Sequence, residues 1–487
     1  MGICVKNKNM KWNKLITTKR FGMENYYQGN HDGRTEFQRD YDRLIFSPAF
    51  RRLQNKTQVF PLPGSVFVHN RLTHSLEVSC VGRSIGNNVG RELSVKYPEL
   101  ASELGEIGAI VAAACLAHDL GNPPFGHSGE NAIGTFFSEG KGVEYRDRLN
   151  ITPEQWADLT TFEGNANAFR ILTHQFEGRR EGGFVLTYPT LASIVKYPYE
   201  ARFADRKKQK FGFFQSEVKS YERIAEDLGI IRNPYNEDRY ARYPLVYLVE
   251  AADDICYQMM DIEDAYKLRL LTFDETKDLL MRYLPLRRRE RAENEVFKIV
   301  SDENEQISYL RSSVVGTLID GVSKVFVDNE EAILNGEFQG ALIDHLPEEL
   351  REAYKYSSKV SVKKIYRAQM VLDIELAGYK IISELLDVLM AAVFEPEKAY
   401  SKQFLSRIPQ QYNVSAESDY EKVQSILDYI SGMTDVYALD LYRKIIAINQ
   451  YLLFEQDEIG MDDDNKMQLG TVVVRLGNED TKVSIAA

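Results

Sequence analysis

Residues 117–130 read AHDLGNPPFGHSGE, and they follow an alanine-rich, proline-free apolar run over residues 107–117. Such a run predicts a buried helix. Gly121 suits the C-terminal cap of that helix, and the two prolines that follow cannot donate helical hydrogen bonds. We therefore predict that His118 and Asp119 lie together at the end of a buried helix.

The pair His118 and Asp119 can be satisfied in two ways. A buried imidazole and a buried carboxylate are unfavourable unless each has a partner. A divalent metal ion would bind both side chains, whereas a core histidine could instead hydrogen-bond to a capping aspartate. The dipeptide alone favours the second interpretation, because it is common by chance.

Composition narrows the class of protein. The chain has 487 residues, 44% of them hydrophobic, which is enough for a large core. Its formal net charge of −12 argues against bulk attraction to nucleic acid or to an anionic membrane. The four cysteines lie far apart and form no CxxC pair, which favours a reducing compartment. The apolar run at 107–117 is too short to span a bilayer, so we expect a cytoplasmic protein without membrane contact.

Two further helical patterns direct polar side chains inward. The helix expected upstream of the His-Asp pair carries His74 in line with its apolar face. A second helix, expected over residues 245–268, carries Asp253, Tyr257 and Asp261 on one face at i, i+4 and i+8. Three such groups that face one way indicate a functional site.

These helices supply a set of metal-binding side chains: His74, His118, Asp119 and Asp253. Two imidazoles and two carboxylates leave positions open on a six-coordinate ion, as a catalytic metal site requires. Mn²⁺ or Mg²⁺ fits this mixed set better than a closed structural zinc site, and Fe²⁺ or another transition ion is an alternative. The full set favours a metal site over a core histidine.

His127 and Glu130 are spaced i, i+3 after the two prolines. At this spacing the carboxylate can orient the imidazole and hold its proton, which is the arrangement of a general acid. The alternative is a histidine at a helix start followed by a first-turn glutamate. No P-loop or GxGxxG signature occurs, so phosphate binding would depend on side chains such as Arg71, Lys196 and the basic cluster 206–210.

Six motifs together resemble the dGTP triphosphohydrolase family of the HD-domain superfamily. They are RRLQNKTQVFPL, RLTHSLEVS, AHDLGNPPFGHSGE, FEGNANAFRI, LVEAADDICYQMMDIEDA and ISGMTDVYALDLYR. The resemblance spans about residues 37–445. It implies an all-α HD-domain fold with additional C-terminal helices, and the helical periodicities along the chain agree with that fold class.

The resemblance also implies roles for individual residues. His74, His118, Asp119 and Asp253 match the metal ligands, and His127 and Glu130 match a catalytic pair beside the α-phosphate. Gln58 matches a glutamine that reads the base and sugar edge, Tyr257 an aromatic residue at the sugar 2′-position, and Asp261 a carboxylate for the 3′-hydroxyl. Arg71, Asn165, Lys196 and Tyr197 match contacts to the phosphates. Asn122 departs from branches of the family that carry a histidine there.

We divide the chain into four parts. Residues 1–35 are polar and aperiodic and are expected to form an N-terminal arm. Residues 36–270 would form the HD catalytic core, and 271–460 a helical C-terminal part packed on it. Residues 461–487 form a tail in which TVVVR at 471–475 is strand-like.

We therefore expect metal-dependent hydrolysis of deoxynucleoside triphosphates, preferentially dGTP, to deoxynucleoside and tripolyphosphate. By resemblance, the chain would form a homo-oligomer, and single-stranded DNA would be a candidate regulator. One alternative is an HD phosphodiesterase or nucleotidase that acts on another phosphate ester. The other is a non-catalytic single-strand nucleic-acid binder, in which Phe211, Phe213 and Phe214 beside the basic cluster would stack on bases.

Overall fold

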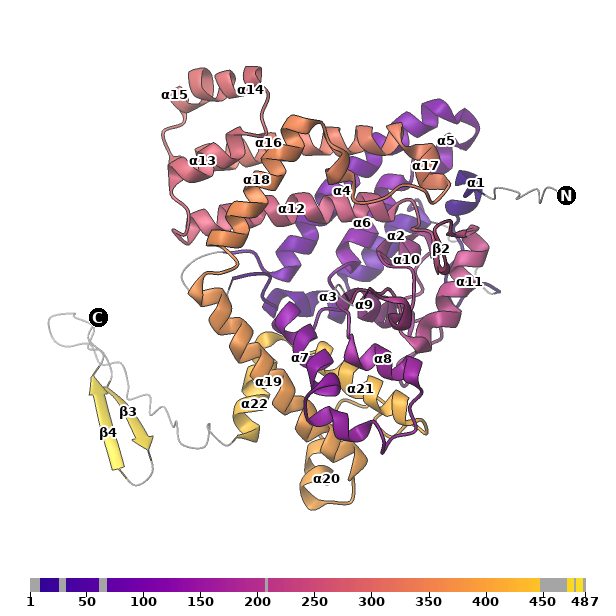
Figure 1. Cartoon of the computed structure of the whole chain (residues 1–487), viewed down its shortest axis with the longest axis vertical. Helices are drawn as coiled ribbons and strands as arrows, with labels where there is room; N and C mark the ends of the chain where they lie inside the picture. The colour runs from indigo at the N-terminus through magenta and orange to yellow at the C-terminus, as the bar shows by residue number, and fades with distance from the viewer. Residues whose placement is uncertain are drawn as a thin grey trace. The chain divides into compact units, whose positions relative to one another are not determined.

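The computed structural model describes residues 9–25, 32–60, 68–205 and 209–446, together with the backbone of 471–476 and 479–484. This part of the chain is predominantly helical, which confirms the predicted all-α class (Figure 1). Two compact units are present, residues 1–435 and residues 436–487. Every candidate site residue lies in the first unit.

The first unit begins with α1 (Trp12–Leu15), α2 (Glu36–Ile45), α3 (Pro48–Arg52), α4 (Arg71–Lys96), α5 (Ala101–Leu104), α6 (Ile107–Ala117) and α7 (His127–Ser138). It continues with α8 (Pro153–Thr160), α9 (Gly164–Thr173), α10 (Tyr188–Ile194), α11 (Val218–Leu228), α12 (Val246–Lys267), α13 (Phe273–Met281), α14 (Leu286–Arg291) and α15 (Phe297–Ile299). The later helices are α16 (Glu303–Asp328), α17 (Glu330–Leu334), α18 (Glu348–Lys364), α19 (Gln369–Phe394), α20 (Ala399–Leu405), α21 (Asp419–Ser431) and α22 (Asp435–Ile445).

Within the described residues, the strands form two antiparallel pairs. One joins β1 (Arg232–Asn233) to β2 (Asn236–Tyr240). The other is a hairpin of β3 (Thr471–Leu476) and β4 (Glu479–Ser484), which confirms the strand predicted at residues 471–475.

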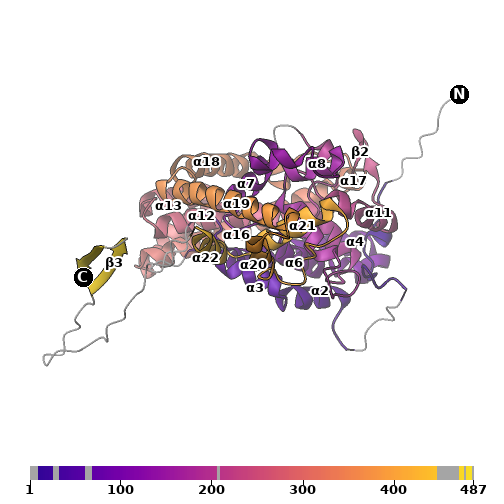
Figure 2. The same ribbon diagram turned by 90° about the horizontal axis from the view of Figure 1, so that it is seen from below.

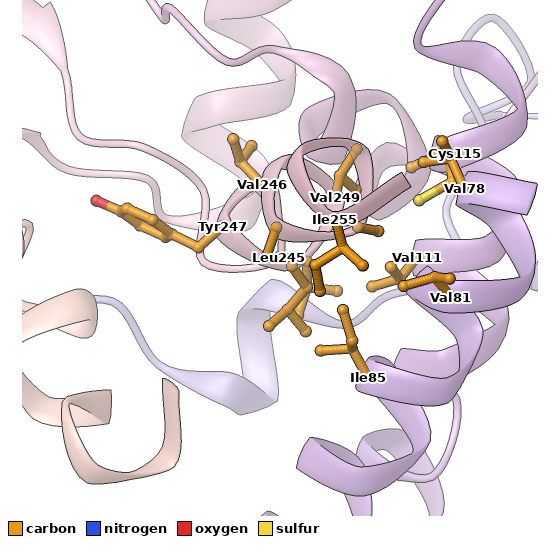
Figure 3. Close-up of a cluster of buried hydrophobic side chains, with 14 of the residues drawn as sticks. Val78, Val81, Ile85, Val111, Cys115, Leu245, Val246, Tyr247, Val249 and Ile255 are labelled. Atoms are coloured by element: carbon orange, nitrogen blue, oxygen red, sulfur yellow. The ribbon is translucent and has the colours of Figure 1, made fainter. Parts of the chain in front are cut away.

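The core of the first unit is built on α4, α6 and α12. The small side chains of α6 let α4 pack along it, and α12 contacts both helices. Figure 3 shows this apolar contact. Its labelled residues include Val78, Val81 and Ile85 of α4, Val111 and Cys115 of α6, and Val246, Val249 and Ile255 of α12. The three helices that the sequence predicts to carry the metal-binding side chains are therefore held against one another by hydrophobic burial.

The later helices cover this core from two directions. Helix α16 packs against α4 and α12, whereas α19 packs against α7 and α21 (Figures 1 and 2). Helix α7, which begins at His127, packs on α19 and α8.

Local signals explain where the key helices begin and end. Asn70 caps α4, since its side chain accepts a hydrogen bond from Thr73 N at 2.9 Å and its own backbone N–H donates one to Thr73 Oγ1 at 3.1 Å. Helix α6 ends at Ala117, four residues before the predicted cap at Gly121. Gly121, however, is not its cap. A Cβ at Gly121 would lie 2.1 Å from Ala168 N, so the glycine is needed for close packing on α9.

The described part of the predicted N-terminal arm, residues 9–25, packs on the core instead. Met10, Trp12 and Leu15 are buried. Arg20 is also buried and pairs with Asp40 at 2.6 Å and with a second carboxylate of α2. The irregular spacing of these apolar residues hides their burial from a search for periodicity.

One described stretch, Pro98–Ala117, could cross a membrane by length and composition alone. In the structure it is divided between α5 and α6, and nearly all of α6 is buried against neighbouring helices. These are the features of a core helix in a folded domain, which passes the same test of length and hydropathy.

Candidate active site

Three separate helices bring His74, His118 and Asp253 together. Their ligand atoms all lie within 4.8 Å of one another. His74 Nε2 is 3.1 Å from Asp253 Oδ1, and His118 Nε2 is 3.6 Å from the same oxygen. This convergence requires His74 on the first turn of α4, His118 directly after α6 and Asp253 in the second turn of α12.

Asp119 lies beside this cluster. Its Oδ1 is 3.8 Å from His118 Nε2, and its Oδ2 is 3.0 Å from a guanidinium nitrogen of Arg71. Asn122 donates a hydrogen bond to the other side of the Asp119 carboxylate. The structure therefore brings together all four residues predicted as metal ligands.

The donor set fits a divalent cation. His118 Nδ1 lies 2.6 Å from the carbonyl oxygen of Cys115, so Nδ1 donates and Nε2 presents a lone pair. That Nε2 is buried and has no hydrogen-bond partner among the described residues. Burial opposes ionisation of the Asp253 carboxyl, yet the neighbouring His118 and His74 imidazoles outweigh it and hold its pKa well below its usual range. A buried acceptor next to an ionised carboxylate suits a cation.

A cavity of about 550 Å³ opens onto this cluster. The predicted site residues that line it are Gln58, Arg71, His118, Asp119, His127, Glu130, Asn165, Lys196, Tyr197, Asp253 and Tyr257. His74 lies behind the lining, since its side chain is only 1% exposed. Asp261 is not among the lining residues either.

His127 and Glu130 form a hydrogen-bonded pair at the start of α7. His127 Nδ1 is 3.0 Å from Glu130 Oε2, and this bond raises the pKa of His127 above its ordinary value. The second carboxylate oxygen accepts a hydrogen bond from Gly164 N at 3.0 Å, which ties Glu130 to α9. The His127 side chain is 76% exposed, so Nε2 can reach a molecule in the cavity. The pair can deliver a proton there.

Cationic side chains line the same cavity. Lys210 Nζ is 2.6 Å from Glu163 Oε2 and 3.7 Å from Glu130 Oε2. Lys196 Nζ is 3.1 Å from Glu250 Oε1. Residues 206–208 of the predicted basic cluster lie outside the described part of the chain. Glu163 was missed by the sequence reasoning, although it stands in the quoted motif FEGNANAFRI.

Tyr257 faces a second tyrosine that the sequence reasoning missed. The ring centroids of Tyr257 and Tyr366 lie 5.8 Å apart, and both rings line the cavity. Tyr366 donates a hydrogen bond to Asp261 Oδ2 at 2.7 Å. Burial raises the pKa of Asp261 to about 7. In this structure Asp261 therefore accepts a hydrogen bond from Tyr366 and does not itself line the cavity. Tyr366 lies between α18 and α19, in a stretch with no recognisable motif.

The three phenylalanines proposed to stack on nucleic-acid bases are buried. Phe211 is 0% exposed, and Phe213 and Phe214 are nearly as inaccessible. They pack on other aromatic residues of the core, including Phe169 and Phe162. The single-strand binding surface suggested for residues 206–214 is therefore wrong with respect to these rings, because hydrophobic burial has taken them out of solvent.

Comparison with known proteins agrees with this geometry. The HD domain family matches residues 71–178, and the phosphohydrolase-associated domain matches residues 345–444. A deoxyguanosinetriphosphate triphosphohydrolase-like protein of Synechocystis sp. is 37% identical over 452 residues, which cover 90% of this chain and 100% of that protein. A protein of the same description from Pseudomonas aeruginosa is also 37% identical, over 90% of this chain and 98% of its own length.

A deoxyguanosinetriphosphate triphosphohydrolase of Yersinia enterocolitica is 31% identical over 508 residues, which cover 89% of this chain and 98% of that protein. Identity at this level over nearly the full length of both chains confirms the resemblance seen in the six motifs. The chain belongs to the deoxyguanosinetriphosphate triphosphohydrolase-like family of HD-domain hydrolases.

Proposed function

We propose that this chain is a metal-dependent triphosphohydrolase that converts deoxynucleoside triphosphates, preferentially dGTP, to deoxynucleoside and tripolyphosphate. The observation that carries the proposal is a single cavity that joins a metal-type donor set, a hydrogen-bonded His127–Glu130 pair and several cationic side chains. The names of the related proteins support the choice of a deoxynucleoside triphosphate.

The metal would be held by His74, His118, Asp119 and Asp253. When bound, a divalent ion supplies Lewis-acid stabilisation of the phosphate charge. Manganese and magnesium are our first candidates, because oxygen and imidazole donors suit both ions. Arg71 and Asn122 orient the Asp119 carboxylate through the contacts described above.

His127 would act as the general acid on the leaving 5′-oxygen. Its hydrogen bond to Glu130 keeps the proton on Nδ1 and favours the imidazolium form. The exposed Nε2 then carries the proton that passes to the leaving oxygen. Gly164 N fixes the far oxygen of Glu130, so the pair is anchored on α9 as well as on α7.

The triphosphate would lie along the cationic side of the cavity. Lys196 and Lys210 pair with carboxylates in this structure, and a polyanion could take over those contacts. Arg71, Asn165 and Tyr197 line the same cavity. Several cationic side chains can neutralise the charge of a triphosphate, which carries more negative charge than a phosphate monoester.

Base and sugar selection would fall to Gln58 and Tyr257. Gln58 Oε1 is buried and has no hydrogen-bond partner among the described residues. A buried acceptor on a cavity wall favours a base edge that carries N–H donors, as guanine does. Tyr257 would exclude a ribose by contact with C2′, and Asp261 would take the 3′-hydroxyl if Tyr366 released it.

A product assay on the four dNTPs and GTP tests the proposal. The purified chain is incubated with each nucleotide and either Mn²⁺ or Mg²⁺, and the phosphate products are separated by anion exchange. We expect deoxyguanosine and tripolyphosphate from dGTP at the highest rate. Release of pyrophosphate or orthophosphate instead would overturn the proposal and favour a phosphodiesterase or nucleotidase, which the same metal set could serve.

We further propose a cytoplasmic homo-oligomer, with single-stranded DNA as a candidate regulator, on the strength of the family resemblance. Light scattering measures the oligomeric state directly. Addition of an oligonucleotide to the dGTP assay tests regulation, and an unchanged rate would remove DNA from the proposal.

A further inference from the structure

We propose that Asp435 is a positioning residue for the active site, because it fixes the turn that delivers His127. The proposal rests on the proposed function, which gives His127 its role as an acid. Asp435 is the first residue of α22 and belongs to the first compact unit. It lies 308 positions after His127, so nothing local in the sequence connects the two residues.

The carboxylate of Asp435 bridges two walls of the cavity. One oxygen accepts a hydrogen bond from Phe125 N at 3.0 Å, and the other accepts one from Thr57 N at 2.8 Å. Both Thr57 and Phe125 line the cavity. Asp435 is only 8% exposed, so these two hydrogen bonds form away from bulk water. One side chain therefore holds the segment of Gln58 and the turn before α7 at a constant separation.

Lys56 ties the same three segments a second time. Its ammonium group donates to Asn122 O at 2.6 Å and to Ser431 O at 2.7 Å. Lys56 is buried as well. Two buried side chains, the Lys56 amine as donor and the Asp435 carboxylate as acceptor, thus connect the segment at 56–57, the turn at 122–125 and the junction between α21 and α22.

The turn needs such support because of its backbone. Phe125 has φ +63°, a conformation that residues with a side chain rarely adopt. Its ring packs on α19 at Gly378, where a Cβ would lie 2.5 Å from Phe125 Cβ. Helix α7 begins two residues later at His127. Removal of the Asp435 acceptor would release the Phe125 amide, and the position of the His127 ring would no longer be fixed.

The competing explanation is that Asp435 only stabilises the N-terminus of α22, as a first-turn acid does. In that case its loss would affect the fold but not His127 in particular. A double-mutant cycle separates the two explanations, because residues that act through one another show non-additive effects.

The first experiment is the cycle of Asp435→Asn with His127→Ala, measured as kcat for dGTP. Asparagine retains the shape of aspartate but can accept only one of the two backbone hydrogen bonds. In the wild-type background we expect kcat to fall roughly tenfold, the scale of one lost hydrogen bond to a charged acceptor. In the His127→Ala background we expect a fall of less than about threefold. Equal losses in both backgrounds would overturn the proposal.

The second experiment does not depend on catalysis. Hydrogen exchange is followed by mass spectrometry in wild type, in Asp435→Asn and in the control Asp440→Asn, whose exposed carboxylate pairs with Lys444 on α22. We expect faster exchange in peptides that contain Thr57 and Phe125 for Asp435→Asn, and no change there for the control. Unchanged exchange in both peptides would refute the clamp. A wild type without dNTP hydrolysis would instead refute the proposed function and leave this readout to decide on Asp435.

Discussion

Replacement of Glu130 by glutamine should shift the alkaline limb of the pH–rate profile to lower pH. Glu130 Oε2 accepts from His127 Nδ1, while its Oε1 accepts from Gly164 N. A glutamine oxygen can retain the bond to Gly164. Its amide nitrogen would then face Nδ1 as a donor, which favours the neutral imidazole over the imidazolium. The substitution therefore lowers the pKa of His127 without breaking the anchor on α9.

The size of the shift follows from the geometry. Two opposite charges about 4 Å apart attract by roughly 1 kcal/mol in water and by roughly 4 kcal/mol at an effective dielectric constant of 20. The His127 side chain is 76% exposed, so screening places this pair near the lower limit. Lys210, 3.7 Å from the same carboxylate oxygen, weakens its field further. A loss of about 1 to 1.5 kcal/mol corresponds to about one pKa unit.

The sign of the shift follows from the proposed role of His127 as a general acid. An acid works in its protonated form, so activity declines as the pH rises through the pKa of His127. A lower pKa moves this decline about one pH unit downward in Glu130→Gln. The assay is kcat for dGTP at saturation, from about pH 6 to 10, at constant ionic strength. Glu144→Gln, which changes an exposed glutamate of the turn after α7, is the matched control. A uniformly lower kcat with an unmoved limb would show that Glu130 only anchors α9, and our reasoning would be refuted.

Three further predictions concern the metal, the sugar and stability. His118→Ala should lose bound metal and lower kcat at least a hundredfold while the helical circular dichroism is retained; elemental analysis with full metal occupancy would contradict the assignment. Tyr257→Ala should lower the ratio of kcat/KM for dGTP over GTP by about tenfold or more, and an unchanged ratio in a folded, active variant would remove Tyr257 as the sugar gate. Burial lowers the pKa of His69, but hydrogen bonds to Asp264 and Glu77 outweigh it and raise the pKa to about 10. The folded state therefore binds this proton more tightly than the unfolded state does, so the stabilisation is complete below about pH 6.5 and is lost as the pH rises toward 10. Urea unfolding should show a decline of several kcal/mol over that window, since a shift from 6.5 to about 10 is worth about 1.4 kcal/mol per unit, and His69→Gln should lack this decline; parallel curves would contradict the assignment.

The helices that carry the site could be predicted because their signals are local. The run at 107–117 became α6 with the same bounds, and the helix expected over 245–268 became α12, Val246–Lys267. Asn70 begins α4 through its own side chain, so the inward direction of His74 follows from spacing alone. Periodicity and capping act over a few residues, and a single sequence displays them fully.

Features that depend on tertiary packing were missed. Gly121 looked like a helix cap, whereas its real constraint is the backbone of α9, which lies far along the chain. Phe211 stands beside a basic cluster and looked accessible, yet it packs into the core. Residues 9–25 contain buried side chains at irregular spacing. In each case the deciding contact comes from a distant segment, and no local pattern encodes it.

The same limit explains why the cavity was only half anticipated. The proposed metal ligands come from the core helices, where burial forces them into one place. The opposite wall comes from the loop between α18 and α19 and from the first turns of α19. Tyr366 of the loop and Glu375 of α19 line the cavity there. That wall is positioned by packing of α19 on α7 and on Phe125, contacts that join segments hundreds of residues apart. Chemistry that requires only a donor set can therefore be read from the motifs that contain His74, the His118–Asp119 pair and Asp253. If Tyr257 selects the sugar as proposed, the later helices contribute through Tyr366, whose ring faces Tyr257, so substitutions at Tyr366 should alter substrate preference more than metal binding.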